Sequence, residues 1–400
     1  MTTDYNLAEL DALVEKYFSI EDITYGSPKQ PFVARYRGRI VGENTSEPFD
    51  KLILELSPHH LMPLLREEKG SHVLFLVPDL PKKPALSPKI NLLLFIITLV
   101  SVMLSGGMYG YEGEVPQNFA LLIWEFIKSG WPFAISLLAI LGSHELGHYF
   151  AGKRNGVQVS LPFFIPFPFS LFGTMGAFIN MRSLPKNRNA LFDLSVAGPL
   201  SGFFVSLIVL VIGLNLSEVG QLPVAAGTAG ALQMEGNSLL YLFLKYLTFG
   251  KLLPAPPGLS GSSLLAYWIR YFFTGQPFPW GGLDVMLHPV AWAGWAGLLV
   301  TGFNLIPAGQ LDGGHIFYTV FGKKTADYAF PLIIAILILL GFVWPTWWLW
   351  ALLTLFLGRS HAEPLDLVTP LDNRRRRIGY LVLAIFILIF VPVPITFVSI

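Results

Sequence analysis

Two histidines four residues apart lie within a continuous apolar stretch, and this placement limits what the chain can fold into. His144, Glu145 and His148 all fall inside the apolar run from position 131 to position 150. Ionisable side chains are costly inside a membrane span unless they are paired, bound to a metal or facing a polar cavity. We therefore expect these three residues to form a site inside a membrane.

The spacing of the three residues indicates metal chemistry. Histidines at positions i and i+4 share one face of a helix, so both rings can bind the same zinc ion. The glutamate beside the first histidine can then act as a general base. Chance occurrence of this short pattern is the competing interpretation, and the cost of burying charges in a membrane argues against it.

The composition favours a membrane protein without nucleic-acid or thiol chemistry. Apolar residues make up 53% of the chain and charged residues 13%, whereas soluble proteins carry about a quarter charged residues. The net charge of +1 predicts no binding of nucleic acid. Because the chain has no cysteine, a bound metal must be held by histidine and carboxylate side chains.

Residues 1–80 differ from the rest of the chain and predict a small soluble α+β domain. Charges are spread throughout, and no apolar run is long enough to cross a membrane. A helix capped by Asn6 is expected first. The other expected elements are strands at 32–40 and 73–77, with a helix or turn around 60–67 between them.

Residues 81–89 are expected to form a basic hinge at the membrane surface, because Lys82, Lys83 and Pro84 follow one another there. The acidic start of the sequence lacks the basic and apolar segments of a signal peptide and the composition of a transit peptide. The N-terminal domain is therefore expected in the cytoplasm. A bacterial plasma membrane, or a cyanobacterial thylakoid, is the expected location.

Residues 90–400 are predicted to form a polytopic α-helical membrane domain with about seven transmembrane helices. Basic residues gather in the loops on the side of the N-terminus, which places the N-terminus inside and the C-terminus outside. The stretch 217–287 has two apolar patches that are too short to cross, so a helical hairpin on the membrane surface is expected. The expected spans are 90–104, 131–150, 190–214, 290–321, 328–343, 347–357 and 378–395.

The segment 157–182, between the second and third spans, is expected to enter the membrane and return as a re-entrant β-hairpin. Basic residues flank both of its ends. Three prolines prevent a regular helix: Pro162, Pro166 and Pro168. The residues whose free strand edge is predicted to pair with an extended substrate are Gly176, Ala177, Phe178 and Ile179. A hairpin that only fills the cavity is the alternative.

The expected span 290–321 is too long for a straight crossing and should be interrupted. Four helix-breaking residues lie in its middle: Pro307, Gly309, Gly313 and Gly314. Unwound chain inside a membrane is tolerated where it lines a cavity or binds an ion. Asp312 would otherwise be an uncompensated carboxylate, so we expect it to join His144 and His148 as the third protein ligand of one Zn²⁺ ion.

Together the two motifs resemble the site-2 protease family of intramembrane metalloproteases. The hallmarks of that family are His-Glu-x-x-His and a later Asn-x-x-Pro-x-x-x-Leu-Asp-Gly, which matches from Asn304 to Gly313. The small residues from Ala197 to Gly202 are similar to the family motif that lets helices pack closely around the site. The chain looks most like the cyanobacterial and plastid branch, which carries a soluble N-terminal segment, and the resemblance runs from about Leu93 to the C-terminus.

The resemblance implies a zinc endopeptidase that cuts within or near the membrane segment of single-span or polytopic membrane proteins. It implies zinc ligation by His144, His148 and Asp312, with Glu145 as the catalytic base. Asn304 would be a second catalytic residue that holds the substrate carbonyl or the oxyanion. A structural amide that satisfies the broken backbone is the alternative for Asn304. The oligomeric state is not predicted.

Two other classes of protein fit part of the pattern. An ion- or proton-coupled transporter also buries His, Glu and Asp and uses helices interrupted by Gly and Pro, but no inverted repeat is visible in this sequence. A zinc-binding scaffold without catalysis would not need Glu145. Comparing peptide cleavage by the wild type and by Glu145→Gln separates a protease from both.

Overall fold

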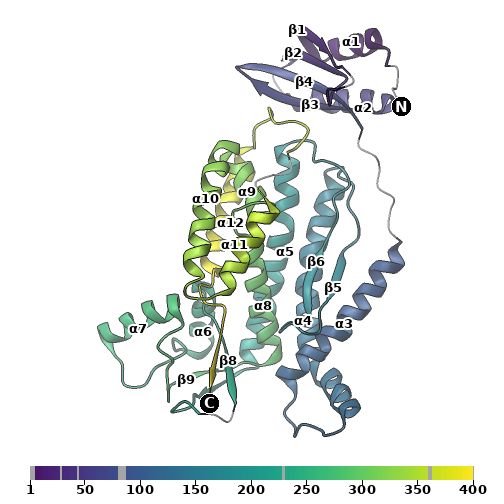
Figure 1. Ribbon diagram of the computed structural model, residues 1–400. Helices are drawn as coiled ribbons and strands as arrows, with labels where there is room; N and C mark the ends of the chain where they lie inside the picture. The colour runs from purple at the N-terminus through teal and green to yellow at the C-terminus, as the bar shows by residue number, and fades with distance from the viewer. Residues whose placement is uncertain are drawn as a thin grey trace.

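The computed structural model describes residues 5–27, 29–42, 45–79, 87–227, 230–358 and 363–399. A small N-terminal domain lies at one end of a bundle of helices, and a group of short helices and strands lies at the other end (Figure 1). The C-terminus lies beside this second group, so the two ends of the chain are at opposite ends of the bundle.

The N-terminal domain is an α+β fold built on a four-stranded antiparallel sheet. The strands lie in the order β1-β2-β4-β3, and helices α1 and α2 contribute apolar side chains to the same core. The Asn6 side chain caps α1 by accepting a hydrogen bond from the backbone N–H of Glu9. The bounds are α1 (Leu7–Glu15), β1 (Phe18–Tyr25), β2 (Ala34–Ile40), α2 (Ser46–Leu56), β3 (Leu61–Glu68) and β4 (Ser71–Pro78).

The structure corrects one expected element of this domain and adds two. The region expected as a helix or turn around 60–67 is strand β3, in which Leu61, Pro63 and Leu65 are buried at every second position. This period of two belongs to a strand, and a short 3₁₀ turn, Ser57–His59, connects it to α2. The sequence patterns did not reveal α2 or β1, because charged residues interrupt the apolar alternation of β1.

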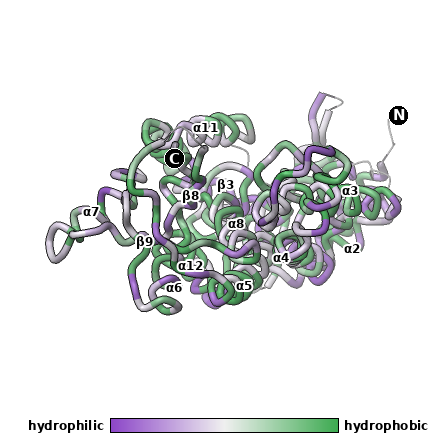
Figure 2. The backbone as a smooth tube through the Cα atoms, turned by 90° about the horizontal axis from the view of Figure 1, so that it is seen from below, coloured by the Kyte–Doolittle hydropathy of each residue, from purple (hydrophilic) through white to green (hydrophobic). Residues whose placement is uncertain are grey.

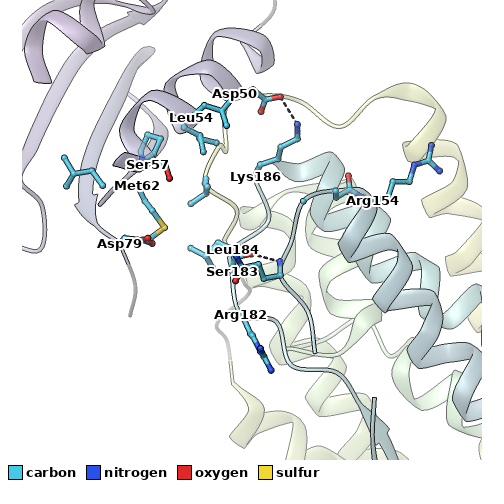
Figure 3. Close-up of a pocket in the computed structure, with 17 residues that line it drawn as sticks. Asp50, Leu54, Ser57, Met62, Asp79, Arg154, Arg182, Ser183, Leu184 and Lys186 are labelled. Carbon is cyan, nitrogen blue, oxygen red and sulfur yellow. Dashed lines mark hydrogen bonds and ion pairs between the residues drawn. The ribbon is translucent and has the colours of Figure 1, made fainter. Parts of the chain in front are cut away.

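The N-terminal domain is attached to the bundle through the edge of its sheet. The backbone N–H of Leu65 in β3 donates to the carbonyl of Leu365 at 2.8 Å, and the N–H of Leu367 donates to the carbonyl of Leu65 at 3.1 Å. The N–H of Asp366 donates to the carbonyl of Lys186, just before the third long helix. Lys186 also forms an ion pair with Asp50 of α2 at 2.7 Å (Figure 3). These contacts hold the domain over one end of the bundle.

Among the residues that the structure describes, three helices are long and apolar enough to cross a membrane, which marks the chain as a membrane protein. Figure 2, which looks at the molecule from below, shows many hydrophobic residues along these helices, with hydrophilic ones between them. The three are α3 (Pro88–Gly110), α4 (Phe119–Arg154) and α5 (Arg188–Asn215). The later helices of the bundle are α8 (Pro289–Asn304), α9 (Asp312–Phe321), α10 (Lys323–Leu340), α11 (Thr346–Leu357) and α12 (Asn373–Ile389).

Several boundaries differ from the expected spans. Helix α3 begins at Pro88 with Ser87 as its cap, so the end of the expected hinge 81–89 is helical, while 81–86 lie outside the described residues. Helix α4 begins at Phe119 and not near position 131, so Pro132 lies inside it. The additional turns pack tightly on α3, where a Cβ added to Gly107 would lie 2.5 Å from Phe126.

The last expected span, 378–395, is shorter than predicted because α12 ends at Ile389. Pro392 and Pro394 follow and cannot donate helical hydrogen bonds. The chain then forms β10 (Ile395–Ser399), which pairs with β8 (Ala231–Glu235).

The stretch 217–287 contains the two expected helices, α6 (Leu239–Phe249) and α7 (Gly261–Thr274). It also contains three strands that the sequence did not reveal. Strand β7 (Glu218–Gln221) pairs with β9 (Leu283–Met286), and β8 pairs with the C-terminal β10. Because each partner is distant in sequence, no local pattern announces these pairs.

The expected hairpin is present as two antiparallel strands, β5 (Phe163–Pro166) and β6 (Thr174–Phe178). Figure 1 shows it lying along α3 and α4 within the height of the bundle. Polar side chains of α3 hold it by donating hydrogen bonds to its backbone carbonyls. Ser101 binds Gly173 at 2.6 Å, and three other residues act in the same way: Asn91, Ser105 and Tyr109.

Candidate metal centre

Three possible metal ligands from two helices meet inside the bundle. Nε2 of His144 lies 3.0 Å from Nε2 of His148, and each lies 3.4 Å from Oδ2 of Asp312. The two rings are buried and Asp312 is half-buried. Nitrogen and oxygen ligands at about 2.0–2.2 Å from a tetrahedral zinc ion are about 3.3 Å from one another. The three atoms therefore fit one zinc ion.

The carbonyl of Leu194 in α5 orients the second histidine. Nδ1 of His148 lies 2.7 Å from this oxygen. A carbonyl can only accept, so Nδ1 carries the proton and the lone pair of Nε2 is directed to the metal position. Pro199, inside α5, has no N–H to donate one turn back. The hydrogen bond that is missing would go to the carbonyl of Ser195, the residue after Leu194.

Small residues of α5 make room for the two rings. A Cβ on Gly198 would lie 2.1 Å from Nε2 of His148, and a Cβ on Gly202 would lie 3.2 Å from Nδ1 of His144. On the facing helix, a Cβ on Gly147 would lie 2.5 Å from the carbonyl oxygen of Ala197. The expected close packing around the site is therefore present, and it depends on residues without side chains.

The interruption between α8 and α9 carries the third ligand into the site. Residues 305–311 are not helical, and Gly309 has a φ of +61°, which only glycine adopts readily. Asp312 is the first residue of α9. Its carboxylate therefore lies at the positive end of a helix dipole, which favours the charged form that a metal requires.

Glu145 lies in the same cavity as the ligands. The end of strand β6 and the residue that follows it, Ile179, line this cavity as well. The cavity has a volume of about 260 Å³. It is lined by His144, Glu145, His148, Ala177, Phe178, Ile179, Met181, Leu194, Ser195, Asn304, Gln310, Leu311, Asp312 and His315.

The structure brings nearly all of the predicted site residues together. Asn304, the last residue of α8, lines the cavity with Glu145 and the three possible ligands. Ala177, Phe178 and Ile179 also line it, whereas Gly176 lies on the same strand but is not among the lining residues.

Sequence reasoning missed the Leu194 carbonyl, Met181 and Gln310. A backbone acceptor leaves no signature in the sequence. Pro199 shows only that one helical hydrogen bond is missing beside Leu194, not that the Leu194 carbonyl meets a histidine.

Comparison with known proteins agrees with this geometry. Residues 132–343 match the description "Peptidase family M50". The chain is 32% identical over 323 residues to the "Probable zinc metalloprotease EGY1, chloroplastic" of Oryza sativa subsp. japonica, covering 76% of this chain and 50% of that relative. It is 31% identical over 275 residues to the "Probable zinc metalloprotease EGY2, chloroplastic" of Arabidopsis thaliana, covering 68% and 44%. No solved structure matches the chain.

The chain belongs to Peptidase family M50. This confirms the predicted site-2 protease family, and the plant relatives agree with the predicted plastid branch. The chain spans about half the length of the curated relatives it matches.

Proposed function

We propose that this protein is an intramembrane zinc endopeptidase that hydrolyses a peptide bond within or near the membrane segment of other membrane proteins. The observation that carries the proposal is the meeting of His144, His148 and Asp312 at the distances that one zinc ion requires, in a cavity that also holds Glu145. The names of the relatives, probable zinc metalloproteases, support the choice of metal and reaction.

Each residue has a role that follows from its position. A zinc ion bound here would supply Lewis-acid chemistry, polarising a peptide carbonyl and lowering the pKa of a water molecule. Glu145 takes a proton from the attacking water and passes it to the leaving amine. Asn304 donates a hydrogen bond to the oxygen that becomes negatively charged.

The substrate binds in extended form along β6. A helix in lipid hides its peptide bonds, so the segment to be cut must first unwind. One edge of β6 pairs with β5, while Ala177, Phe178 and the following Ile179 line the cavity that holds Glu145. The opposite edge of β6 is therefore directed to the catalytic side and suits strand addition. Single-span and polytopic membrane proteins are the substrate class.

Replacing Ala177 with Pro tests the strand edge, because proline removes a backbone donor from β6 without touching a metal ligand. Cleavage should fall while the zinc content stays at one ion per chain. A cleavage rate equal to the wild type would remove β6 as the substrate strand.

The membrane arrangement is part of the proposal. We infer about seven crossings, with β5 and β6 as a re-entrant hairpin and the stretch 217–287 on the far membrane surface. The N-terminal domain, residues 1–80, and the nearby end of the site lie on the cytoplasmic side, as the loop charges suggest. From the sequence we infer that the protein is located in a bacterial plasma membrane or a cyanobacterial thylakoid. The names of the matched relatives describe those proteins as chloroplastic. Labelling of single introduced cysteines from each side of sealed vesicles tests the orientation.

Reconstitution with a tagged single-span reporter protein tests the function. The wild type should cleave it, and Glu145→Gln should lose at least about 100-fold in rate while keeping its zinc. Equal rates would remove Glu145 as the base. No cleavage by either protein, with ion flux across the vesicle membrane, would favour a transporter, and bound zinc without either activity would favour a scaffold.

A further inference from the structure

A second and larger cavity, of about 750 Å³, lies between the N-terminal domain and the bundle. Figure 3 shows its two walls, with Leu54, Ser57 and Met62 on the domain and Ser183 and Leu184 on the chain that leads to α5. Cavities at domain interfaces are common ligand sites. No residue of this cavity belongs to the lining of the metal site.

The two cavities are nevertheless lined by residues that are close together in the sequence. Met181 lines the metal site, and the next residue, Arg182, lines the interface cavity. On α4, His148 lines the first and Arg154 lines the second. Along the helix axis, these two residues are six positions and therefore about 9 Å apart. An extended strand covers this distance with about three residues. A substrate strand leaving the metal site toward the N-terminal domain therefore reaches the interface cavity almost at once.

The domain wall of the cavity includes an open strand edge. In β3, Leu65 uses its outward N–H and carbonyl to bind residues 365 and 367. Backbone groups two and four residues earlier point to the same side, and these belong to Pro63 and Leu61, which line the cavity. Proline, which has no backbone N–H, is tolerated on an edge strand when its nitrogen points away from the neighbouring strand, as the nitrogen of Pro63 does here. Within the described residues, no backbone partner occupies this half of the edge.

The same wall exposes apolar surface. Leu54 of α2 is 73% exposed, although it faces the cavity, and Met62 and Leu184 are half-buried beside it. An apolar side chain from an extended segment would be covered by these three residues. Charge contributes less, because Lys186 is already paired with Asp50, and Figure 3 shows Arg154 extending away from the other labelled residues.

We propose that the interface cavity binds the part of the substrate that lies next to the cleaved segment, on the side of the N-terminal domain. This flank binds as an extended strand along Leu61–Pro63. One of its apolar side chains packs against Leu54, Met62 and Leu184. This inference rests on the proposed proteolysis and gives the N-terminal domain a role in substrate binding. It defines the preferred substrates as membrane proteins with an extended flank that carries an apolar residue about three to six residues from the cleaved bond.

Kinetics with two reporter proteins test the proposal. One reporter has an extended flank of about ten residues with a central leucine, and the other ends shortly after its membrane segment. Leu54→Asp should raise KM for the long reporter about tenfold with little change in kcat, and should leave the short reporter unaffected. Val41→Asp, at a 49% exposed position of the same domain outside the cavity, is the matched control and should change neither.

Cross-linking tests the position of the flank directly. A photoreactive residue at position 54, in the Glu145→Gln background, should cross-link the flank of the long reporter, and one at position 41 should not. Cross-links confined to the protein's own chain, to lipid or to a second copy, together with an unchanged KM in Leu54→Asp, would overturn the inference. If the wild type still cleaves both reporters and Glu145→Gln cleaves neither, that result would leave the proteolytic function intact.

Discussion

Two clusters of ionisable side chains, one inside the bundle and one in the group of short helices and strands at its far end, differ in one respect. The metal site contains two imidazoles and a carboxylate, and within the described residues no lysine or arginine forms an ion pair with Asp312. The far cluster contains Glu235 and Asp284, and Nζ of Lys245 lies 3.6 Å from each carboxylate. All three residues of the far cluster are buried.

The presence or absence of a basic side chain distinguishes the two clusters: the metal site needs a cation from outside the protein, whereas the far cluster contains Lys245. In the far cluster the ammonium also lies 4.5 Å from the centre of the Tyr241 ring, so the chain itself compensates the carboxylates. In the metal site, three lone pairs converge without a cation from the protein. A zinc ion held by His144, His148 and Asp312 would supply the missing charge, whereas Lys245 already supplies it in the far cluster.

The largest expected effect is on zinc binding. Asp312→Ala should weaken zinc binding by about 4–5 kcal/mol, because it removes one of three protein ligands. Elemental analysis of the purified protein should then show less than one zinc ion per chain, and His148→Ala should give the same result. Lys245→Met should keep its zinc. Full zinc content in both ligand variants would contradict the proposed coordination.

A substitution in the far cluster should lower the stability of the protein without changing its zinc content. Lys245→Met leaves two buried carboxylates without their cation, which should lower the free energy of unfolding by about 3–5 kcal/mol. Thermal unfolding in lipid nanodiscs measures the change. Lys251→Met, at an exposed position nearby, is the control and should have little effect. Equal unfolding temperatures in the two variants would show that the far cluster is not a stabilising ion pair.

A smaller effect is expected from a single methyl group beside the metal site. Gly198→Ala should weaken zinc binding by about 1–3 kcal/mol, since its Cβ would lie 2.1 Å from Nε2 of His148 and would displace the ring. Gly142→Ala is the control, because the nearest atom to its added Cβ is 4.0 Å away. A competition titration with a zinc chelator measures both. Equal affinities would mean that the close packing of α5 does not position the ligand.

The smallest effect concerns pH and the far cluster. Burial raises the pKa of Glu235 from 4.5 to about 7, although Lys245 opposes the shift. The folded state therefore holds this proton more tightly than the unfolded state, and the resulting stability is lost as pH rises from about 5 through 7. The unfolding temperature should fall over this range, and Glu235→Gln should flatten the fall. The same slope in the variant would assign the pH dependence to other groups.

The contrast between the clusters also shows what the sequence could predict. His144, Glu145, His148 and Asp312 were identified because charged residues in apolar spans are costly and their spacing is specific to metal chemistry. The far cluster was not found, since Lys245, Glu235 and Asp284 come from three short elements whose strands pair with distant partners.

The same limit explains the errors in the fold. The attachment of Leu365 to the β3 edge joins residues 300 positions apart, and no local pattern predicts it. Strand β3 was taken for a helix or turn because Met62 and Leu64, on its half-buried face, are apolar like the buried residues between which they lie, and this hides the period of two in the sequence. The second span was predicted at 131–150 from its apolar run, whereas packing against α3 extends helix α4 back to Phe119.

Zinc K-edge X-ray absorption of the purified protein tests the central claim most directly. The account predicts one zinc ion bound by two imidazole nitrogens and carboxylate or water oxygens at about 2.0–2.2 Å, with the carboxylate contribution lost in Asp312→Asn. A spectrum without imidazole scattering, or one that Asp312→Asn leaves unchanged, would contradict it.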